Sequence, residues 1–490
     1  MNSTFHKTLA KLICLLVILS LIPSGLGLAQ SGSHPAPAVP FEEAAIVELA
    51  PETTFSLAMT MALLSGDVFQ NGADRLAGLQ NNDGGWDWPL NDGNPANISA
   101  KNTVGPIAQG LAKAYLHTAD PDHLAALQKA GTLLLAKVYD FSPSDGYLAA
   151  TLDDIFGGTT YTDHVTNYFY GPLAAGTYNR NGAGTNYNTA QYVNLIRTGR
   201  AGSQANLAAW DIGMGLAGAA AVGADTTAWV NGLKTEIDEL NTSAYYDVIG
   251  LAGAIYGLAF VGEDYDPQTG PHAVADSLAD LGMILAGYQL ASGGFTWNSY
   301  ALDEGADNES VQETAYAILA LNTLDRVTHL ARIEAAGSYL ESVQLGTGGW
   351  EGYTGSGENN EITGEALWAI HAAYPYTFTG FSEPIDMSMI NSAKAGQTIA
   401  VKWRLTDADG LPVSDASSFV NLRTEPGSCD VGVPSDAIET YSGGSGLQYL
   451  GDGYWQYNWK TPKSYAGRCR SMYVEFNEGF LSPIVTFRFK

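Results

Sequence analysis

Positively charged side chains are scarce in this chain. Its 490 residues contain 23 lysines and arginines against 51 aspartates and glutamates, which gives a formal net charge of −28. A field of this sign repels phosphate and carboxylate groups, so it disfavours nucleic acid, acidic polysaccharide and anionic lipid as partners. The excess of acids predicts a solvated acidic surface, and it leaves neutral ligands open.

Cysteine is almost absent. Of the three cysteines, Cys14 lies in an N-terminal apolar segment, and Cys429 and Cys469 lie in the last quarter of the chain. In an oxidising compartment we expect these last two to form a disulfide. No group of cysteines and histidines has the spacing of a structural zinc site, so the sequence predicts no metal site.

Long apolar runs are missing beyond the N-terminal segment. Lys7 and Lys11 precede an apolar run from Leu12 to Ile22, and small residues follow up to Ala29. This order is typical of a secretory signal peptide, and the run is too short for a comfortable membrane span. We therefore expect a signal peptide at 1–29, a linker at 30–51, and a protein without a membrane span. Bacterial-type export would leave it secreted or at the cell surface.

The composition changes near residue 380. Alanine, glycine and leucine dominate residues 52–378 with helical periodicity, whereas residues 381–490 contain short runs of valine and aromatic residues between turn residues. The first pattern predicts helices, and the second predicts an antiparallel β-sandwich. We expect a mainly α protein that ends in a small Ig-like β-sandwich domain.

One short motif recurs in the helical region. QNNDGGW at 80–86 returns as QLASGGF at 289–295 and as QLGTGGW at 344–350. The paired glycines permit positive φ, so the chain can reverse, and the glutamine can bond carbonyl groups at a helix end. The motif therefore predicts a repeated helix–turn–helix unit.

The helices on the two sides of these turns differ in polarity. Those before the turns carry charged residues, whereas those after them are apolar almost all round, which is typical of helices buried on every side. This alternation predicts two concentric rings of six helices. The outer helices are expected at about 69–80, 121–138, 187–198, 226–240, 275–290 and 328–344, and the inner ones at about 102–118, 163–178, 205–222, 245–261, 309–324 and 361–374.

The best copy of the motif, from Gly337 to Trp350, resembles the QW repeat of the terpenoid cyclase and protein prenyltransferase superfamily. The resemblance covers about residues 52–376 and implies a six-hairpin α/α toroid. The end of the chain resembles the PxKF-type module of some exported bacterial proteins, although Ala400 and Trp403 stand where the name-giving proline and phenylalanine would be.

Acidic residues recur near the expected N-terminal ends of the inner helices. The candidate catalytic residues are Asp163, Asp211, Asp247 and Glu313. Converging carboxylates could supply the general acid and base that sugar cleavage requires. The same residue types also suit helix caps and first turns, so a purely structural role stays open for each.

Aromatic residues follow the same expected loops. Trp88, Trp297, Tyr168 and Tyr170 are the candidate ligand-binding residues, because their rings could stack on sugars or line an isoprenoid pocket. No cofactor is evident. The acid-rich segment 303–309 could hold calcium, but it lacks the spacing of an EF-hand.

Three functions remain open from the sequence. The first is an extracellular carbohydrate-active hydrolase or lyase with an acidic, aromatic-lined cavity. The second is a non-catalytic ligand-binding or scaffold protein. The third is a terpenoid-cyclase-like enzyme, but the Asp-x-Asp-Asp acid motif of such cyclases is missing, and so is the zinc-binding cysteine of the prenyltransferases.

Overall fold

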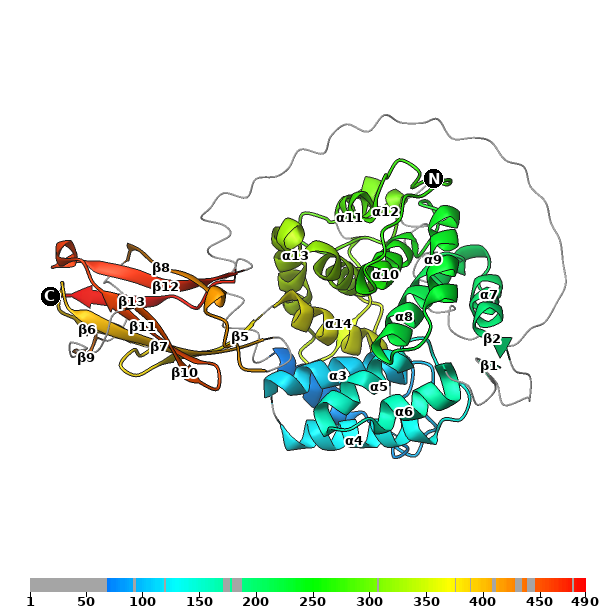
Figure 1. Ribbon diagram of the computed structural model, residues 1–490, viewed down its shortest axis with the longest axis horizontal. Helices are drawn as coiled ribbons and strands as arrows, with labels where there is room; N and C mark the ends of the chain where they lie inside the picture. The colour runs from blue at the N-terminus through cyan, green and yellow to red at the C-terminus, as the bar shows by residue number, and fades with distance from the viewer. Residues whose placement is uncertain are drawn as a thin grey trace. The chain divides into compact units, whose positions relative to one another are not determined.

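The computed structural model describes residues 68–490, apart from 91–93, 119, 171–176, 179–186, 306–307, 375, 388, 408–410, 428–433, 439–445 and 478–479 (Figure 1). The predicted signal peptide and linker lie outside the described residues, and so does Cys429. The described part of the chain is mainly α-helical and continues into a C-terminal β region, as the composition predicted.

Helices occupy most of the chain up to residue 373. An unlabelled helix at 68–78 comes first. It is followed by α3 (Val104–Thr118), α4 (Pro121–Ala136), α5 (Asp145–Phe156), α6 (Thr160–Val165), the π-helical turn η1 (Thr166–Tyr170), α7 (Thr189–Gly199), α8 (Leu207–Ala221), α9 (Thr227–Glu239), α10 (Asp247–Phe260), α11 (Leu278–Ala286), α12 (Ser299–Glu304), α13 (Val311–Ser342) and α14 (Asn360–Ala373).

A kink divides α13 into the two helices that the sequence predicted. Asp325 leaves the helical conformation at φ −161° and ψ 90°. The first half, up to the kink, is almost entirely buried, whereas the second half buries one side only. The two halves therefore correspond to the expected inner helix 309–324 and outer helix 328–344.

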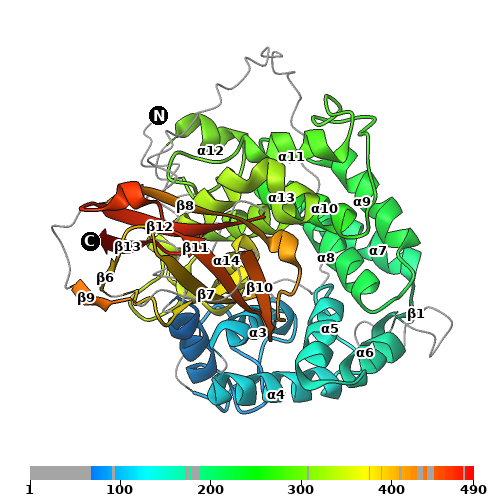
Figure 2. The ribbon, with the colours of Figure 1, turned by 60° about the vertical axis from the view of Figure 1, so that its left-hand side comes forward.

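The buried helices contact one another in sequence order. Helix α3 packs on α5, α5 on α8, α8 on α10, α10 on α13 and α13 on α14, and α14 returns to pack on α3. Figure 2 shows α4, α6, α7 and α9 on the outer side of these helices. The expected alternation of buried and surface helices is therefore present in the described part of the chain.

Glycines allow the closest of these contacts. A Cβ atom placed on Gly110 of α3 would lie 1.9 Å from the carbonyl oxygen of Gly364 of α14, and one on Gly213 of α8 would lie 2.0 Å from that of Gly253 of α10. Any larger residue would force the two backbones apart. The small residues of the apolar segments therefore act as helix-contact positions.

The recurring glutamines join the ends of neighbouring surface helices. The Gln80 side chain donates to Gly84 O at 2.9 Å and to Ala126 O of α4 at 2.8 Å. Gln344 does the same with Gly348 O at 2.8 Å and Val68 O at 3.0 Å. The bond from Gln344 to Val68 links the second half of α13 to the helix at 68–78.

The glycine and tryptophan of the motif complete each turn. The glycines at 84, 293 and 348 have φ values of 96°, 93° and 94°, a region that suits glycine. Trp86 and Trp350 are fully buried, and their indole nitrogens donate to Leu76 O and Leu340 O at 2.8 and 2.7 Å. These tryptophans hold the turn together.

The predicted second inner helix, 163–178, is wrong. Helix α5, at 145–156, contacts both α3 and α8, whereas residues 160–170 form the short α6 and η1. Residues 171–176 lie outside the described part, and the last two residues of the predicted helix form strand β1 (Thr177–Tyr178). The sequence misled us because α5 carries Asp153 and Asp154 and so has no uniformly apolar surface.

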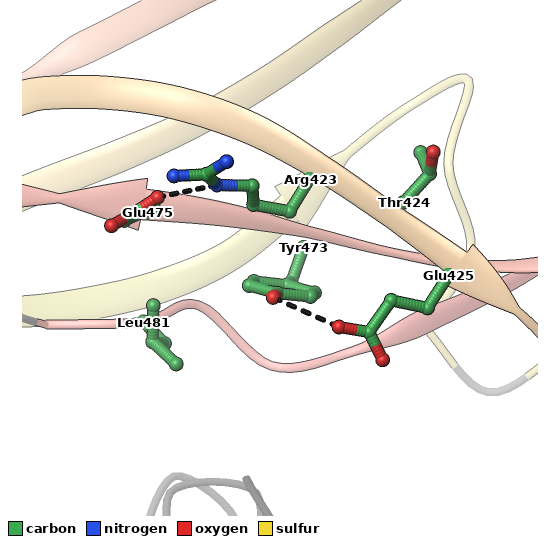
Figure 3. Close-up of a pocket in the computed structure, with 6 residues that line it drawn as sticks. All are labelled: Arg423, Thr424, Glu425, Tyr473, Glu475 and Leu481. Atoms are coloured by element: carbon green, nitrogen blue, oxygen red, sulfur yellow. Dashed lines mark hydrogen bonds and ion pairs between the residues drawn. The ribbon is translucent and has the colours of Figure 1, made fainter. Parts of the chain in front are cut away.

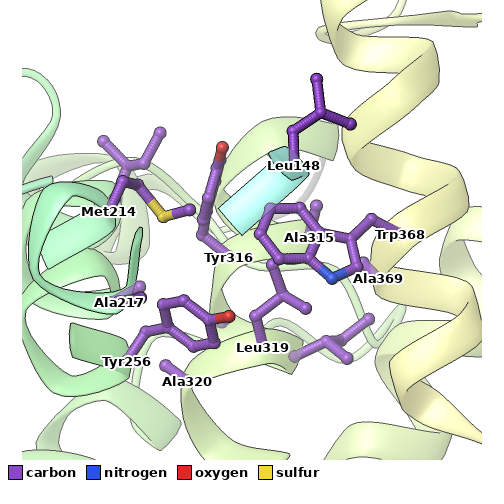
Figure 4. Close-up of a cluster of buried hydrophobic side chains, with 14 of the residues drawn as sticks. Leu148, Met214, Ala217, Tyr256, Ala315, Tyr316, Leu319, Ala320, Trp368 and Ala369 are labelled. Carbon is purple, nitrogen blue, oxygen red and sulfur yellow. The ribbon is translucent and has the colours of Figure 1, made fainter. Parts of the chain in front are cut away.

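Large side chains fill the space among the buried helices. Leu148, Met214, Tyr256, Tyr316 and Trp368 come from five different helices and lie close together (Figure 4). The Trp368 ring centroid is 6.0 Å from that of Tyr256, in an edge-on arrangement. The middle of the helical region is thus a packed core at this level.

The C-terminal strands form two sheets with one hydrophobic core. The strands are β5 (Tyr376–Ser382), β6 (Ile390–Ala393), β7 (Thr398–Asp407), β8 (Phe419–Pro426), β9 (Pro434–Ala437), β10 (Gly446–Gly451), β11 (Tyr454–Lys460), β12 (Cys469–Phe476) and β13 (Val485–Phe489). One sheet has the order β10-β11-β7-β5 and the other β8-β12-β13-β6-β9. Short two-stranded pairs, β1 (Thr177–Tyr178) with β2 (Tyr187–Asn188) and β3 (Trp350–Glu351) with β4 (Glu358–Asn359), lie within the helical region.

Two strand pairs depart from the antiparallel pattern that the sequence predicted. Strand β6 runs parallel to both β13 and β9.

Trp455 and Trp459 of β11 are buried in the shared core. Cys469 is buried on β12, and its expected partner Cys429 lies outside the described residues, so the disulfide stays a prediction.

Candidate functional site

Four carboxylates gather near the N-terminal ends of three buried helices. They are Asp211 of α8, Glu313 of α13, and Glu361 and Glu365 of α14, and we call them the acidic cluster. Glu361 lies close enough to Asp211 for their charges to interact, and Glu365 interacts in the same way with Glu361 and Glu313. The structure therefore brings two of the predicted catalytic residues, Asp211 and Glu313, into one site.

Glu361 is the cluster member whose pKa lies near neutral pH. Its carboxylate is almost completely buried and accepts a hydrogen bond at 2.9 Å from the indole nitrogen of Trp88. Burial, with a smaller contribution from the charge of Asp211, raises the pKa of Glu361 from 4.5 to about 7. A carboxylic acid with this pKa can hold and release a proton near neutral pH.

Asp211 has the opposite environment. Arg200 donates to its Oδ2 atom from Nε at 2.9 Å and from Nη2 at 2.8 Å. The Asp211 side chain is 15% exposed, so water reaches it. An ion pair of this kind stabilises a carboxylate in its charged form, and both contacts use the same oxygen.

Glu365 lies one helical turn beyond Glu361 on the same side of α14. It accepts hydrogen bonds from the Tyr316 hydroxyl at 2.8 Å and from the Gln312 amide at 2.9 Å. Burial, followed by the charge of Glu361, holds the pKa of Glu365 well above its usual range. Glu365 is therefore the fully buried member of the cluster.

Glu313 and Trp210 are the remaining side chains of the acidic cluster and its surroundings. Glu313 is buried in the first turn of α13, where it accepts a short hydrogen bond from the Ser310 hydroxyl, and burial raises its pKa. Trp210, the neighbour of Asp211, is half-buried and lies edge-on to Tyr316 with ring centroids 5.3 Å apart. The cluster therefore combines carboxylates with two half-buried indoles, those of Trp88 and Trp210.

The other two predicted catalytic residues have different surroundings. Asp163 is exposed on α6, where it accepts a hydrogen bond from Thr159 at 2.9 Å, and it does not begin a buried helix. Asp247 begins α10 as predicted, but it has no exposed surface. It accepts a hydrogen bond from Tyr288 at 2.9 Å, and its Oδ1 lies 3.8 Å from His272.

Of the predicted aromatic residues, Trp88 is the one seen to touch the cluster. Tyr170 is buried, and its hydroxyl donates to Gly215 O of α8 at 3.3 Å. Tyr168 is 39% exposed and lies against His164 with centroids 4.8 Å apart. Trp297 is half-buried, and its carbonyl accepts from Val248 N at the start of α10.

Sequence reasoning missed Glu365, Arg200 and Trp210 as site residues. One usable signal was the spacing of Glu361 and Glu365, because residues four apart share one side of a helix. Arg200 carried no such signal, since it lies in the segment before α8 and reaches Asp211 only through the fold. Tyr316 and Gln312 were hidden for the same reason.

A hollow lies on the β region (Figure 3). It has a volume of about 470 Å³ and is lined by Arg423, Thr424, Glu425, Tyr473, Glu475 and Leu481. Arg423 pairs with Glu475 at 2.6 Å, and Tyr473 donates to Glu425 at 3.3 Å. Its charged groups already satisfy one another, so we regard the acidic cluster as the stronger candidate.

No helix in the described part of the chain has the length and apolar character to cross a membrane. Comparison with protein-family models gives no match to this chain, and a search of curated proteins finds no matching relative. The geometry of the acidic cluster therefore carries the functional argument.

Proposed function

We propose that this protein is a secreted carbohydrate-active hydrolase whose active site is the acidic cluster. The observation that carries the proposal is the contrast between two neighbouring carboxylates, a buried Glu361 with a pKa of about 7 and an Asp211 paired with Arg200. Cleavage of a glycosidic bond needs such a pair, one acid that keeps its proton and one carboxylate that stays charged.

Each residue has a defined part in this proposal. Trp88 donates to Oε2 of Glu361, which leaves Oε1 to carry the proton that a departing sugar oxygen receives. Arg200 holds Asp211 by Oδ2, which leaves Oδ1 to take a proton from water or to attack the sugar carbon. The half-buried rings of Trp88 and Trp210 offer apolar faces on which a sugar can stack.

We also propose that the helical region is an α/α toroid and the C-terminal region an Ig-like sandwich. Support for the toroid comes from the helix contacts that return from α14 to α3, and from the bond between Gln344 and Val68. The resemblance of the Gly337–Trp350 motif to the QW repeat agrees with this architecture.

The terpenoid-cyclase alternative has less support. An isoprenoid needs an apolar cavity among the buried helices, and there Trp368 packs edge-on against Tyr256. A non-catalytic binding role uses the same cluster, and it is separated from hydrolysis by the experiment below.

The test is hydrolysis of a panel of neutral oligosaccharides by wild type, Glu361→Gln and Asp211→Asn. We expect both variants to lose at least about 100-fold in kcat/KM, because each removes one partner of the acid–base pair. Asp163→Asn is the matched control, since it alters an exposed acid outside the cluster, and it should keep its activity.

The products decide between the remaining possibilities. Release of reducing ends without an unsaturated product identifies a hydrolase, whereas an unsaturated product identifies a lyase. Sugar binding without turnover would favour the non-catalytic role. Equal loss of activity in the Asp163→Asn control and in Glu361→Gln would contradict the assignment of the site.

A further inference from the structure

A second group of potential metal ligands joins two helices on the surface of the helical region. Asp74 lies on the helix at 68–78, Asp120 caps the N-terminus of α4, and His123 follows in the first turn of α4. One ligand atom from each residue lies within 4.8 Å of the other two. The fold therefore brings together residues that are about fifty positions apart in the sequence.

His123 is held in the orientation that a metal-binding imidazole requires. Its side chain has no exposed surface. Nδ1 lies 2.9 Å from the Thr118 hydroxyl, and Nε2 lies 2.8 Å from Oδ1 of Asp74. Imidazoles that bind metals are usually fixed by a hydrogen bond at the other ring nitrogen, and Thr118 provides such a bond here.

The two carboxylates converge on the same point as His123 Nε2. The Gln70 amide donates to Oδ1 of Asp74 at 2.9 Å and to Oδ2 of Asp120 at 3.2 Å, so these two oxygens face a common space. The other oxygen of Asp120 accepts from Asp122 N at 2.8 Å, which fixes the carboxylate at the helix cap. Asp74 is 58% exposed, so the space is open to solvent on that side.

The charge of the protein also favours a cation at this place. Two carboxylates and an imidazole face one space in a protein with a net charge of −28, a field that attracts cations.

We propose that Asp74 Oδ1, Asp120 Oδ2 and His123 Nε2 bind one divalent transition-metal ion, with zinc as the best-fitting class. Carboxylate oxygens and an imidazole nitrogen suit zinc, whereas calcium and magnesium prefer oxygen ligands alone. Water from the exposed side of Asp74 completes the coordination. Binding uses the neutral tautomer of His123 that carries its proton on Nδ1, where it donates to the Thr118 hydroxyl, and the Gln70 amide moves off the carboxylates.

This site is separate from the acidic cluster. Thr118 is the last residue of α3, whereas Glu361 lies in the first turn of α14. These two helices run parallel, because Gly110 meets Gly364 and His117 meets His371 seven residues further along each. A metal at this place would join the helix at 68–78 to α4, so we assign it a stabilising role. This inference does not depend on the proposed hydrolase activity.

The experiment titrates metal-free purified protein with zinc by calorimetry and with cobalt by visible absorption. We expect one ion per chain and a cobalt band typical of nitrogen and oxygen ligands. Asp74→Asn and Asp120→Asn should each weaken binding by more than about tenfold. Asn also caps helices well, so Asp120→Asn should keep its fold.

Asp122→Asn is the matched control, because it removes an exposed charge from the same turn without touching the three ligand atoms. It should bind zinc like wild type. Thr118→Val should weaken zinc binding by about 10- to 100-fold through the orientation of His123. The proposal is overturned if the wild type binds no zinc, if Asp122→Asn loses as much affinity as Asp74→Asn, or if calcium binds as tightly as zinc.

Discussion

At the scale of single residues, the acidic cluster shows how environment separates carboxylates of similar intrinsic acidity. Glu361 is buried against an indole that can donate only one hydrogen bond, so its charged form is poorly stabilised. Asp211 receives two contacts from a guanidinium and remains in touch with water. The two groups are close enough to interact, yet burial acts on Glu361 and a guanidinium acts on Asp211.

This difference predicts a pH-dependent stability. Burial raises the pKa of Glu361 to about 7, so between pH 4.5 and 7 the native protein holds a proton that the unfolded chain has released. The free energy of unfolding therefore falls as the pH rises through this window. Glu361→Gln removes this pH dependence. We expect the free energy of unfolding of the variant to exceed that of wild type by about 1–3 kcal/mol at pH 8 but by little at pH 5.

Urea unfolding followed by tryptophan fluorescence at pH 5, 6.5 and 8 measures this difference. Asp163→Asn is again the control, because its carboxylate is exposed and should leave the pH dependence unchanged. A stability gap between Glu361→Gln and wild type that is the same at all three pH values would contradict the prediction.

At the scale of helices, close backbone contacts predict where larger residues are not tolerated. A Cβ on Gly110 would lie 1.9 Å from Gly364 O, and this backbone oxygen has no freedom to move away. We expect Gly110→Ala to lower the free energy of unfolding by at least about 2 kcal/mol, because α3 and α14 must separate.

Gly78→Ala provides the matched control. This glycine also lies in a helix, but a Cβ there would meet no atom within 4 Å. Its stability should stay the same or rise by up to about 1 kcal/mol, since alanine favours helix. Thermal unfolding of both variants is the measurement, and equal effects would show that helix contact does not explain the role of Gly110.

The same scale shows what the sequence could predict. The ends of uniformly apolar helices such as α8 and α10 were predicted to within two residues, because nearly every residue of these helices is small or apolar. Helix α5 was missed because one of its acids, Asp153, accepts hydrogen bonds from backbone groups of α6, which no local pattern shows. The parallel pairing of β6 with β13 and β9 was missed for a related reason, since these strands are distant from one another in the sequence.

Prediction of the site followed the same rule. Asp211 and Glu313 were found because acidic residues near the start of a buried helix form a local pattern. Arg200, which distinguishes Asp211 from the other carboxylates, lies outside any such pattern. The metal ligands Asp74 and His123 were also invisible, because their helices meet only after folding.

At the scale of the whole molecule, the net charge decides which substrates reach the cluster. The formal charge of −28 repels acidic oligosaccharides at long range, and the cluster adds carboxylates at short range. A neutral oligosaccharide meets no such barrier. The proposed hydrolase should therefore prefer neutral over acidic substrates of the same length.

Ionic strength tests this preference directly. Salt screens repulsion over about 10 Å at 0.1 M and about 3 Å at 1 M, so kcat/KM for an acidic oligosaccharide should rise several-fold between 0.02 and 1 M salt. For the matched neutral oligosaccharide it should change little, because no charge on the substrate is being screened. Initial rates on the two substrates across this range provide the measurement. Faster turnover of the acidic substrate at low salt would contradict the repulsion argument, and it would indicate that Arg200 is oriented to receive a substrate carboxylate.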